Sequence, residues 1–78
     1  MTARREPVLI DDPLSDAFRR GRDAGRDVVA KSEGDDRALR ALLAALEEAG
    51  PRIEDPLHRE EARGTASLLR EHLGLGVL

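Results

Sequence analysis

The chain has 78 residues, a formal net charge of −3 and no cysteine. That length suffices for one domain, and so short a chain buries only about 60% of the surface that its unfolded form exposes. The missing cysteine excludes disulfides, thiolate metal sites and cysteine nucleophiles, and it is typical of a reducing cytoplasm. We therefore expect one domain over residues 1–78 that gains stability by associating with other chains.

The tripeptide Asp-Pro-Leu occurs twice, at residues 12–14 and 55–57, and each copy precedes a long stretch without proline. An Asp at the N-cap accepts a hydrogen bond from a free backbone N–H of the first turn. A Pro at the next position loses no helical hydrogen bond, because its missing N–H would have been unpaired. The two tripeptides therefore predict two helix starts.

The first helix is predicted over residues 13–32. Its small or apolar residues recur at helical spacing on one face, and charged residues fill the other positions. Ala17, Gly21 and Gly25 lie four residues apart, so they form a smooth ridge that another helix backbone can approach closely. The pattern leaves two interpretations open: tight packing inside the chain, or the seam of a dimer.

The second helix is predicted over residues 36–49, after a stop at Gly34 and a new N-cap at Asp35 or Asp36. We expect Gly50 to adopt the left-handed conformation beyond its end, and Pro51 to prevent its continuation. Leucines form one stripe and alanines cover nearly the whole remaining circumference. Such a helix is expected to sit centrally in the fold.

The third helix is predicted over residues 56–73, with Gly74 as its stop. Gly64 and Thr65 in its middle favour a bend or a close contact. The fold class is thus all-α: a small three-helix bundle or open helical array, with a short extended N-terminal arm at residues 7–10 and a C-terminal tail at residues 75–78. Both ends are apolar, so we expect them to dock rather than stay in water.

Residue types that carry chemistry are few. His58 and His72 are fourteen residues apart, which separates them by about 21 Å on one helix, too far to share a metal ion. Adjacent acids point to different sides of a helix, and the glycines match no phosphate-binding pattern. We therefore predict no catalytic, cofactor-binding or metal site, no small-molecule substrate and no enzymatic activity.

Composition also indicates the setting of the protein. Twelve Arg against one Lys, with no Asn or Gln, indicate a GC-rich coding sequence such as that of a bacterium or its phage. The apolar run after the charged N-terminal residues is only three residues long, so it fits neither a signal peptide nor a membrane span. We expect a cytoplasmic protein without a membrane partner.

The favoured function is a self-associating protein–protein interaction or assembly module, with a dimer as the favoured state and another protein as a further partner. The ridge on the first helix and the two uncharged ends support it. In this hypothesis the ridge makes the close contact and apolar side chains add the anchoring area. The candidate interface comprises Leu14, Ala17, Phe18, Gly21, Gly25, Val28, Val77 and Leu78.

The alternative is a helix-turn-helix-like regulator that binds DNA through its third helix, with Arg59, Arg63 and Arg70 as the nucleic-acid contacts. The link at residues 50–55 is longer than the turn of that motif, and acids are interleaved with the arginines. The acidic balance also lacks the basic footprint of DNA binding. The sequence therefore favours protein association over DNA binding.

Overall fold

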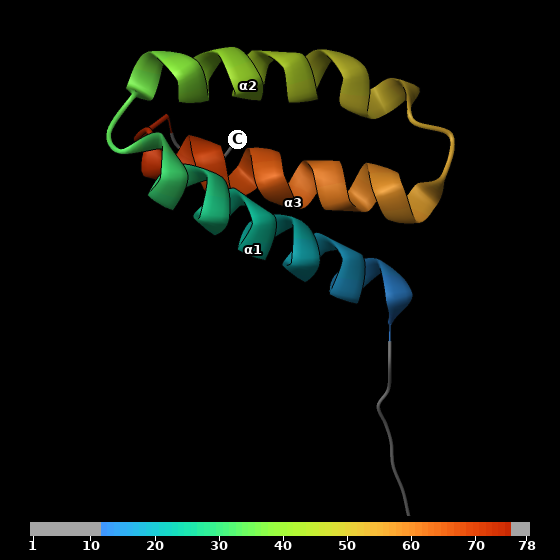
Figure 1. Ribbon diagram of the computed structural model, residues 1–78. Coiled ribbons are helices and arrows are strands. Elements are labelled where there is room, and N and C mark those ends of the chain that lie inside the picture. Colours follow the sequence, from blue (N-terminus) through green and yellow to red (C-terminus); the bar gives the residue numbers. More distant parts are fainter. Residues whose placement is uncertain (1–11, 76–78) are drawn as a thin grey trace, which may run out of the picture.

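The computed structural model describes residues 12–75, which form three helices and one short turn of 3-10 helix. In chain order these are α1 (Pro13–Ser32), α2 (Asp36–Ala49), the 3-10 turn η1 (Gly50–Arg52) and α3 (Pro56–His72), shown in Figure 1. The expected all-α three-helix fold is confirmed, and the predicted bounds differ only by one residue at the end of α3. The predicted arm at residues 7–10, and the tail beyond Leu75, lie outside the described residues.

Aspartates cap the starts of all three helices. The carboxylate of Asp12 accepts a hydrogen bond from the Leu14 N–H at 3.0 Å, and that of Asp55 accepts one from the Leu57 N–H at 2.8 Å. Asp35 caps α2 in the same way through the Ala38 N–H, at 3.1 Å. The helix starts predicted from the repeated tripeptide are therefore confirmed, together with the physical reason for them.

Removal of one cap is expected to destabilise the domain measurably. For Asp55→Ala we expect a loss of about 1 kcal/mol in the free energy of unfolding, because a backbone N–H of the first turn of α3 loses its acceptor. Urea denaturation followed by circular dichroism measures it. Glu54→Ala is the matched control, since the Glu54 side chain is exposed and precedes the cap. Equal stabilities of the two variants would contradict the capping role.

The connections follow the predicted stops with one exception. Gly34 and Gly74 have positive φ angles of 85° and 73°, which glycine adopts without strain. Gly50, in contrast, has φ −51° and ψ −52°, so the prediction of a left-handed Gly50 is wrong. Its N–H still donates to the Leu46 carbonyl, and Pro51 fits the first turn of η1 because its fixed φ is helical. The helical path therefore ends at Ile53, which is extended.

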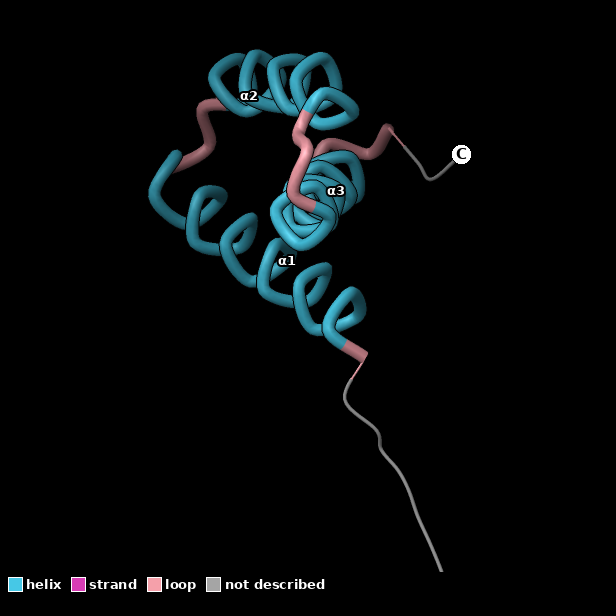
Figure 2. The backbone as a smooth tube through the Cα atoms, turned by 90° about the vertical axis from the view of Figure 1, so that its right-hand side faces the viewer, coloured by secondary structure: helices cyan, strands magenta, loops and turns pink. Residues whose placement is uncertain are grey.

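The third helix, not the second, occupies the middle of the fold. α3 lies between α1 and α2, and most of the interhelix contacts join α1 to α3 (Figures 1 and 2). Figure 2 shows α1 and α2 near each other at their connecting turn and diverging away from it. The expectation that residues 36–49 sit centrally is wrong, because exposed alanines offer little area to bury while glycines let α1 and α3 approach closest. The arrangement is an open helical array.

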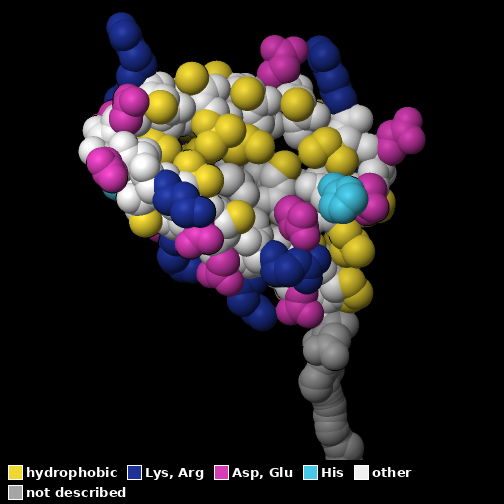
Figure 3. Space-filling view, in the orientation of Figure 1, with side chains coloured by type: hydrophobic (Ala, Val, Ile, Leu, Met, Phe, Trp, Pro, Cys, Tyr) yellow, Lys and Arg dark blue, Asp and Glu magenta, His cyan; other side chains and the backbone are white. Residues whose placement is uncertain are grey.

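The apolar core is small and gathers around three leucines. Leu39, Leu43 and Leu69 are buried, and half-buried residues of all three helices pack against them: Val28, Val29, Leu42, Leu46, Ala66 and Leu73. Figure 3 shows hydrophobic side chains along the seam between α2 and the helices below it. Because α1 and α2 diverge, this core covers mainly the end of the array that lies beside the α1–α2 turn.

Candidate docking groove between α2 and α3

Glycines bring the backbones of α1 and α3 almost into contact. A Cβ placed on Gly21 would lie 2.8 Å from the carbonyl carbon of Glu61, and one on Gly64 would lie 2.9 Å from that of Phe18. The Thr65 hydroxyl donates a hydrogen bond to the Gly21 carbonyl oxygen at 2.7 Å, a contact that only a close helix crossing permits. The small-residue ridge of α1 is therefore packed inside the chain.

This packing decides where the predicted interface residues lie. Ala17, Gly21 and Gly25 are buried within the chain, so they offer a partner no surface. Of the two interpretations of the ridge, the structure has the intrachain one, because Gly64 on α3 provides the matching small residue. Three further interface residues are Leu14, which is exposed, Phe18, which is half-buried, and Val28, which packs against the core. The other two, Val77 and Leu78, lie outside the described residues.

Ion pairs flank the α1–α3 crossing. Arg20 pairs with Glu61 at 3.0 Å, and Arg22 pairs with Glu71 at 3.0 Å while also donating to the Ser67 hydroxyl. The hydrogen bond from Arg22, together with its positive charge, lowers the pKa of Glu71 below its ordinary value of 4.5. The pair therefore ties the end of α3 to α1 only while the Glu71 carboxylate is ionised.

Acidification is expected to weaken this tie. Because the pKa of Glu71 is lower in the folded chain than in the unfolded one, its stabilising effect is complete above 4.5 and is lost as the pH falls through the folded pKa. Between about pH 6 and pH 3, the melting temperature of Glu71→Gln should therefore fall less than that of the unmodified chain. Thermal melts followed by circular dichroism measure this, with Glu54→Gln as the control. If the melting temperatures of Glu71→Gln and Glu54→Gln fell equally over this pH range, the stabilising role of the Glu71 carboxylate would be contradicted.

A groove of about 680 Å³ opens between α2 and α3, beside the core residues Leu46 and Ala66. Its apolar lining consists of Phe18, Leu46, Pro51, Ala62 and Ala66, together with the backbone of Gly50. A second hollow of about 620 Å³, which includes Leu14, adjoins it, because Phe18 and Arg63 line both. The second hollow is lined mainly by polar and charged residues, with Leu14 and Phe18 as its apolar part.

Three guanidinium groups stand along the groove. Arg63 pairs with Glu60 and lies over the Phe18 ring, 5.7 Å from its centroid. Arg70 pairs with Glu47 at 2.7 Å, and Arg59 donates to the Glu54 carbonyl oxygen at 3.5 Å. Glu47 is the one carboxylate among the described residues that line the groove, so its lining is positively charged on balance. These are the three arginines that the DNA-binding alternative uses.

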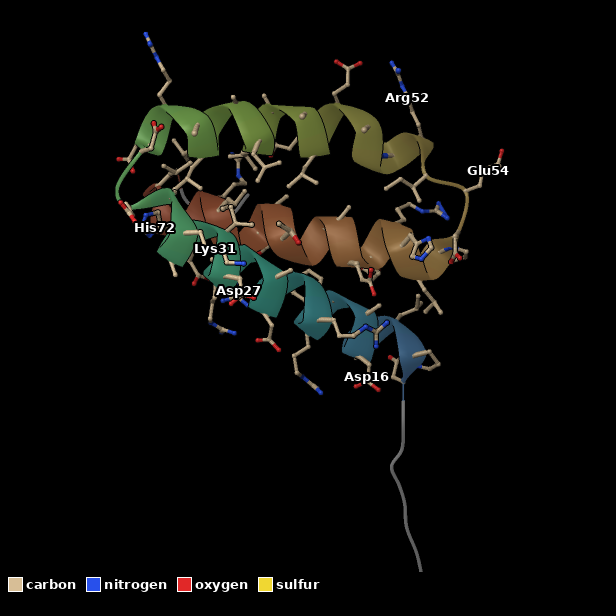
Figure 4. All side chains as sticks on the ribbon, in the orientation of Figure 1. Asp16, Asp27, Lys31, Arg52, Glu54 and His72 are labelled. Carbon is tan, nitrogen blue, oxygen red and sulfur yellow. The ribbon has the colours of Figure 1, made fainter. Side chains whose placement is uncertain are left out.

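The histidines and acids are dispersed. His58 lies at the start of α3, where its Nδ1 is 3.6 Å from the Asp55 carboxylate, whereas His72 lies at the opposite end of that helix. Figure 4 shows His72 beside the α1–α2 turn, and Arg52 and Glu54 at the other end of the array. Over residues 12–75, no three His, Cys, Asp or Glu side chains are grouped so that they could hold a metal ion. None of the helices in that range is both long and apolar enough to cross a membrane.

The groove is the feature that sequence reasoning missed. Its lining comes from all three helices and from η1. The sequence had singled out Phe18 as an interface residue and Arg59, Arg63 and Arg70 as nucleic-acid contacts, but not their convergence on one groove. The diverging course of α1 and α2, which opens the groove, has no counterpart in any local pattern. No protein-family model, curated protein or solved structure matches the chain.

Proposed function

We propose that this chain is a small interaction or assembly module that associates with a second copy of itself and has no catalytic activity. The observation that carries the proposal is the apolar groove between α2 and α3, which the chain's own described residues leave uncovered. A groove with an apolar floor and charged rim is the form in which proteins receive a partner segment.

Two further observations support association. Leu14, Leu57 and Leu75 are large apolar side chains that stay exposed, at 44%, 37% and 40%. Among residues 12–75, the large side chains that are fully buried are Leu39 and Leu69. A domain of this size with so small a core gains most from covering apolar surface with another chain. A symmetric dimer is the favoured state, because it is the commonest closed assembly.

The same reasoning extends to partners and setting. Another protein with an apolar segment is a further partner for the groove. The absence of cysteine supports a cytoplasmic setting, and the arginine-rich composition supports a bacterial or phage source. The DNA-binding alternative has less support, because α3, which carries its three arginines, lies between the other two helices.

The test is the solution mass of the full chain, measured by light scattering over a concentration series, with and without duplex DNA. A dimer whose mass is indifferent to DNA is the expected result. A monomer at every concentration would overturn the proposal, and a rise in mass that needs DNA would favour the alternative. A bulky substitution at Gly21 would not test the dimer, because Gly21 packs against the Glu61 backbone of the same chain and the change would disturb the fold itself.

A further inference from the structure

The residues that line the groove indicate which kind of peptide segment fits it. Its floor is apolar, formed by Phe18, Leu46, Ala62 and Ala66, and Arg59, Arg63 and Arg70 supply a positive balance beside it. A fitting segment therefore has a short apolar centre and acidic residues at its ends. An interaction of this kind combines burial of apolar area with charge complementarity, which sets the direction of the segment.

The chain itself contains such a segment. Residues 7–10 are Pro, Val, Leu and Ile, and they are preceded by Glu6 and followed by Asp11. Resting on the self-association proposed above, we infer that residues 6–11 of a second copy occupy the groove, with the apolar centre against the floor and the two acids toward the arginines. The two copies exchange these segments symmetrically, so each dimer contains two filled grooves.

Chain length favours the second copy over the same chain as the source. Phe18 is the one α1 residue in the groove's lining, and it lies six residues, or about 9 Å of helix, beyond Asp12. Ile10 is only two residues before Asp12, so in its own chain it stays within about 7 Å of that residue. In its own chain the Ile10 end of the segment is therefore tethered beside the start of α1, whereas a segment from a second copy has no such tether and can take any position along the groove.

The first experiment compares Leu9→Asp with Ala3→Asp in the full chain, by light scattering and analytical ultracentrifugation. Both variants add one negative charge before α1, but only Leu9 belongs to the apolar centre. For Leu9→Asp we expect the dimer dissociation constant to rise at least about tenfold, because a leucine leaves the groove and a charge would have to enter it. For Ala3→Asp we expect a change below about threefold, since the added charge lies outside the segment.

The second experiment exchanges charges between segment and groove. One variant carries Glu6→Arg and Asp11→Arg, and the other carries Arg59→Glu and Arg63→Glu. Each alone brings like charges together and is expected to be monomeric at concentrations where the unmodified chain is dimeric. An equimolar mixture is expected to form a heterodimer, because the changed segment then meets the changed groove. Circular dichroism verifies that each variant keeps its helices.

Each outcome decides a different question. Disruption by Leu9→Asp together with a heterodimer in the mixture supports the inference. A dimer unaffected by Leu9→Asp, or a mixture that stays monomeric, overturns it and leaves the proposed self-association standing. An unmodified chain that is monomeric throughout overturns both proposals. If the unmodified chain is monomeric and Leu9→Asp lowers the melting temperature while Ala3→Asp does not, the segment docks within its own chain.

Discussion

Gly64→Ala is expected to push α1 away from α3 and to remove much of the stability of the chain. The added Cβ would lie 2.9 Å from the carbonyl carbon of Phe18 and 3.0 Å from the backbone nitrogen of Arg22, and neither group can turn aside as a side chain can. Overpacking generally costs about 1–3 kcal/mol, and more where backbone must move. A domain of this size has only about 3–5 kcal/mol of stability to lose.

The direction of the change in stability distinguishes an effect of packing from an effect of helix propensity. Alanine in the middle of a helix is favoured over glycine by about 1 kcal/mol, so propensity alone predicts that Gly64→Ala stabilises the chain. Gly25→Ala is the matched comparison, because the nearest atom to an added Cβ there belongs to the Leu68 side chain, at 3.0 Å, and the Thr65 carbonyl oxygen is 3.4 Å away. We expect it to destabilise the chain less than Gly64→Ala does, because a side chain can shift where a backbone group cannot. Urea denaturation measures both, and a stable Gly64→Ala would refute the close crossing.

Leu69→Ala is expected to show the second large effect, a loss of about 2–5 kcal/mol in the free energy of unfolding. Leu69 lies on the central helix, is 0% exposed and belongs to the core cluster with Leu39 and Leu43. Its removal leaves a cavity among residues of all three helices. Loss of the helical circular dichroism signal on urea titration measures the change.

Leu57→Ala is the control for this second prediction, because it makes the same chemical change on the same helix. Leu57 lies in the first turn of α3 and is 37% exposed, so its truncation leaves no enclosed cavity and should cost less than about 1 kcal/mol. The stabilities of both variants should be measured at the lowest usable protein concentration, where association adds least to stability. If Leu57→Ala destabilised the chain as much as Leu69→Ala, the core would lie elsewhere.

Local chemistry accounts for what was predictable about the helices. The caps at Asp12 and Asp55 act within two residues of themselves, and Gly34 and Gly74 stop helices through their own backbone angles. Such signals are complete within a short stretch of sequence, which is why the predicted bounds agree with the observed ones. Gly50 failed as a stop because its neighbours let the helical path continue, and several conformations are open to glycine before proline.

The candidate site was predictable only in part. The ridge of Ala17, Gly21 and Gly25 was recognised as a place where a helix approaches closely, and that is what it does. The sequence could not identify the approaching helix, because a ridge of small residues looks the same whether its partner is in the same chain or in another. The placement of Leu14 and Phe18 next to an open groove likewise needed the positions of α2 and α3.

The sequence by itself therefore determined the number of helices, where they begin and which faces are apolar, because these depend on capping, backbone freedom and the helical period. Only the tertiary structure decided that α3 is central, that Gly21 and Gly64 are buried against each other's helices, and that a groove stays open between α2 and α3. These features depend on residues more than forty positions apart, such as Gly21 and Thr65. Their contact is chosen by the packing of whole helices, which no local pattern contains.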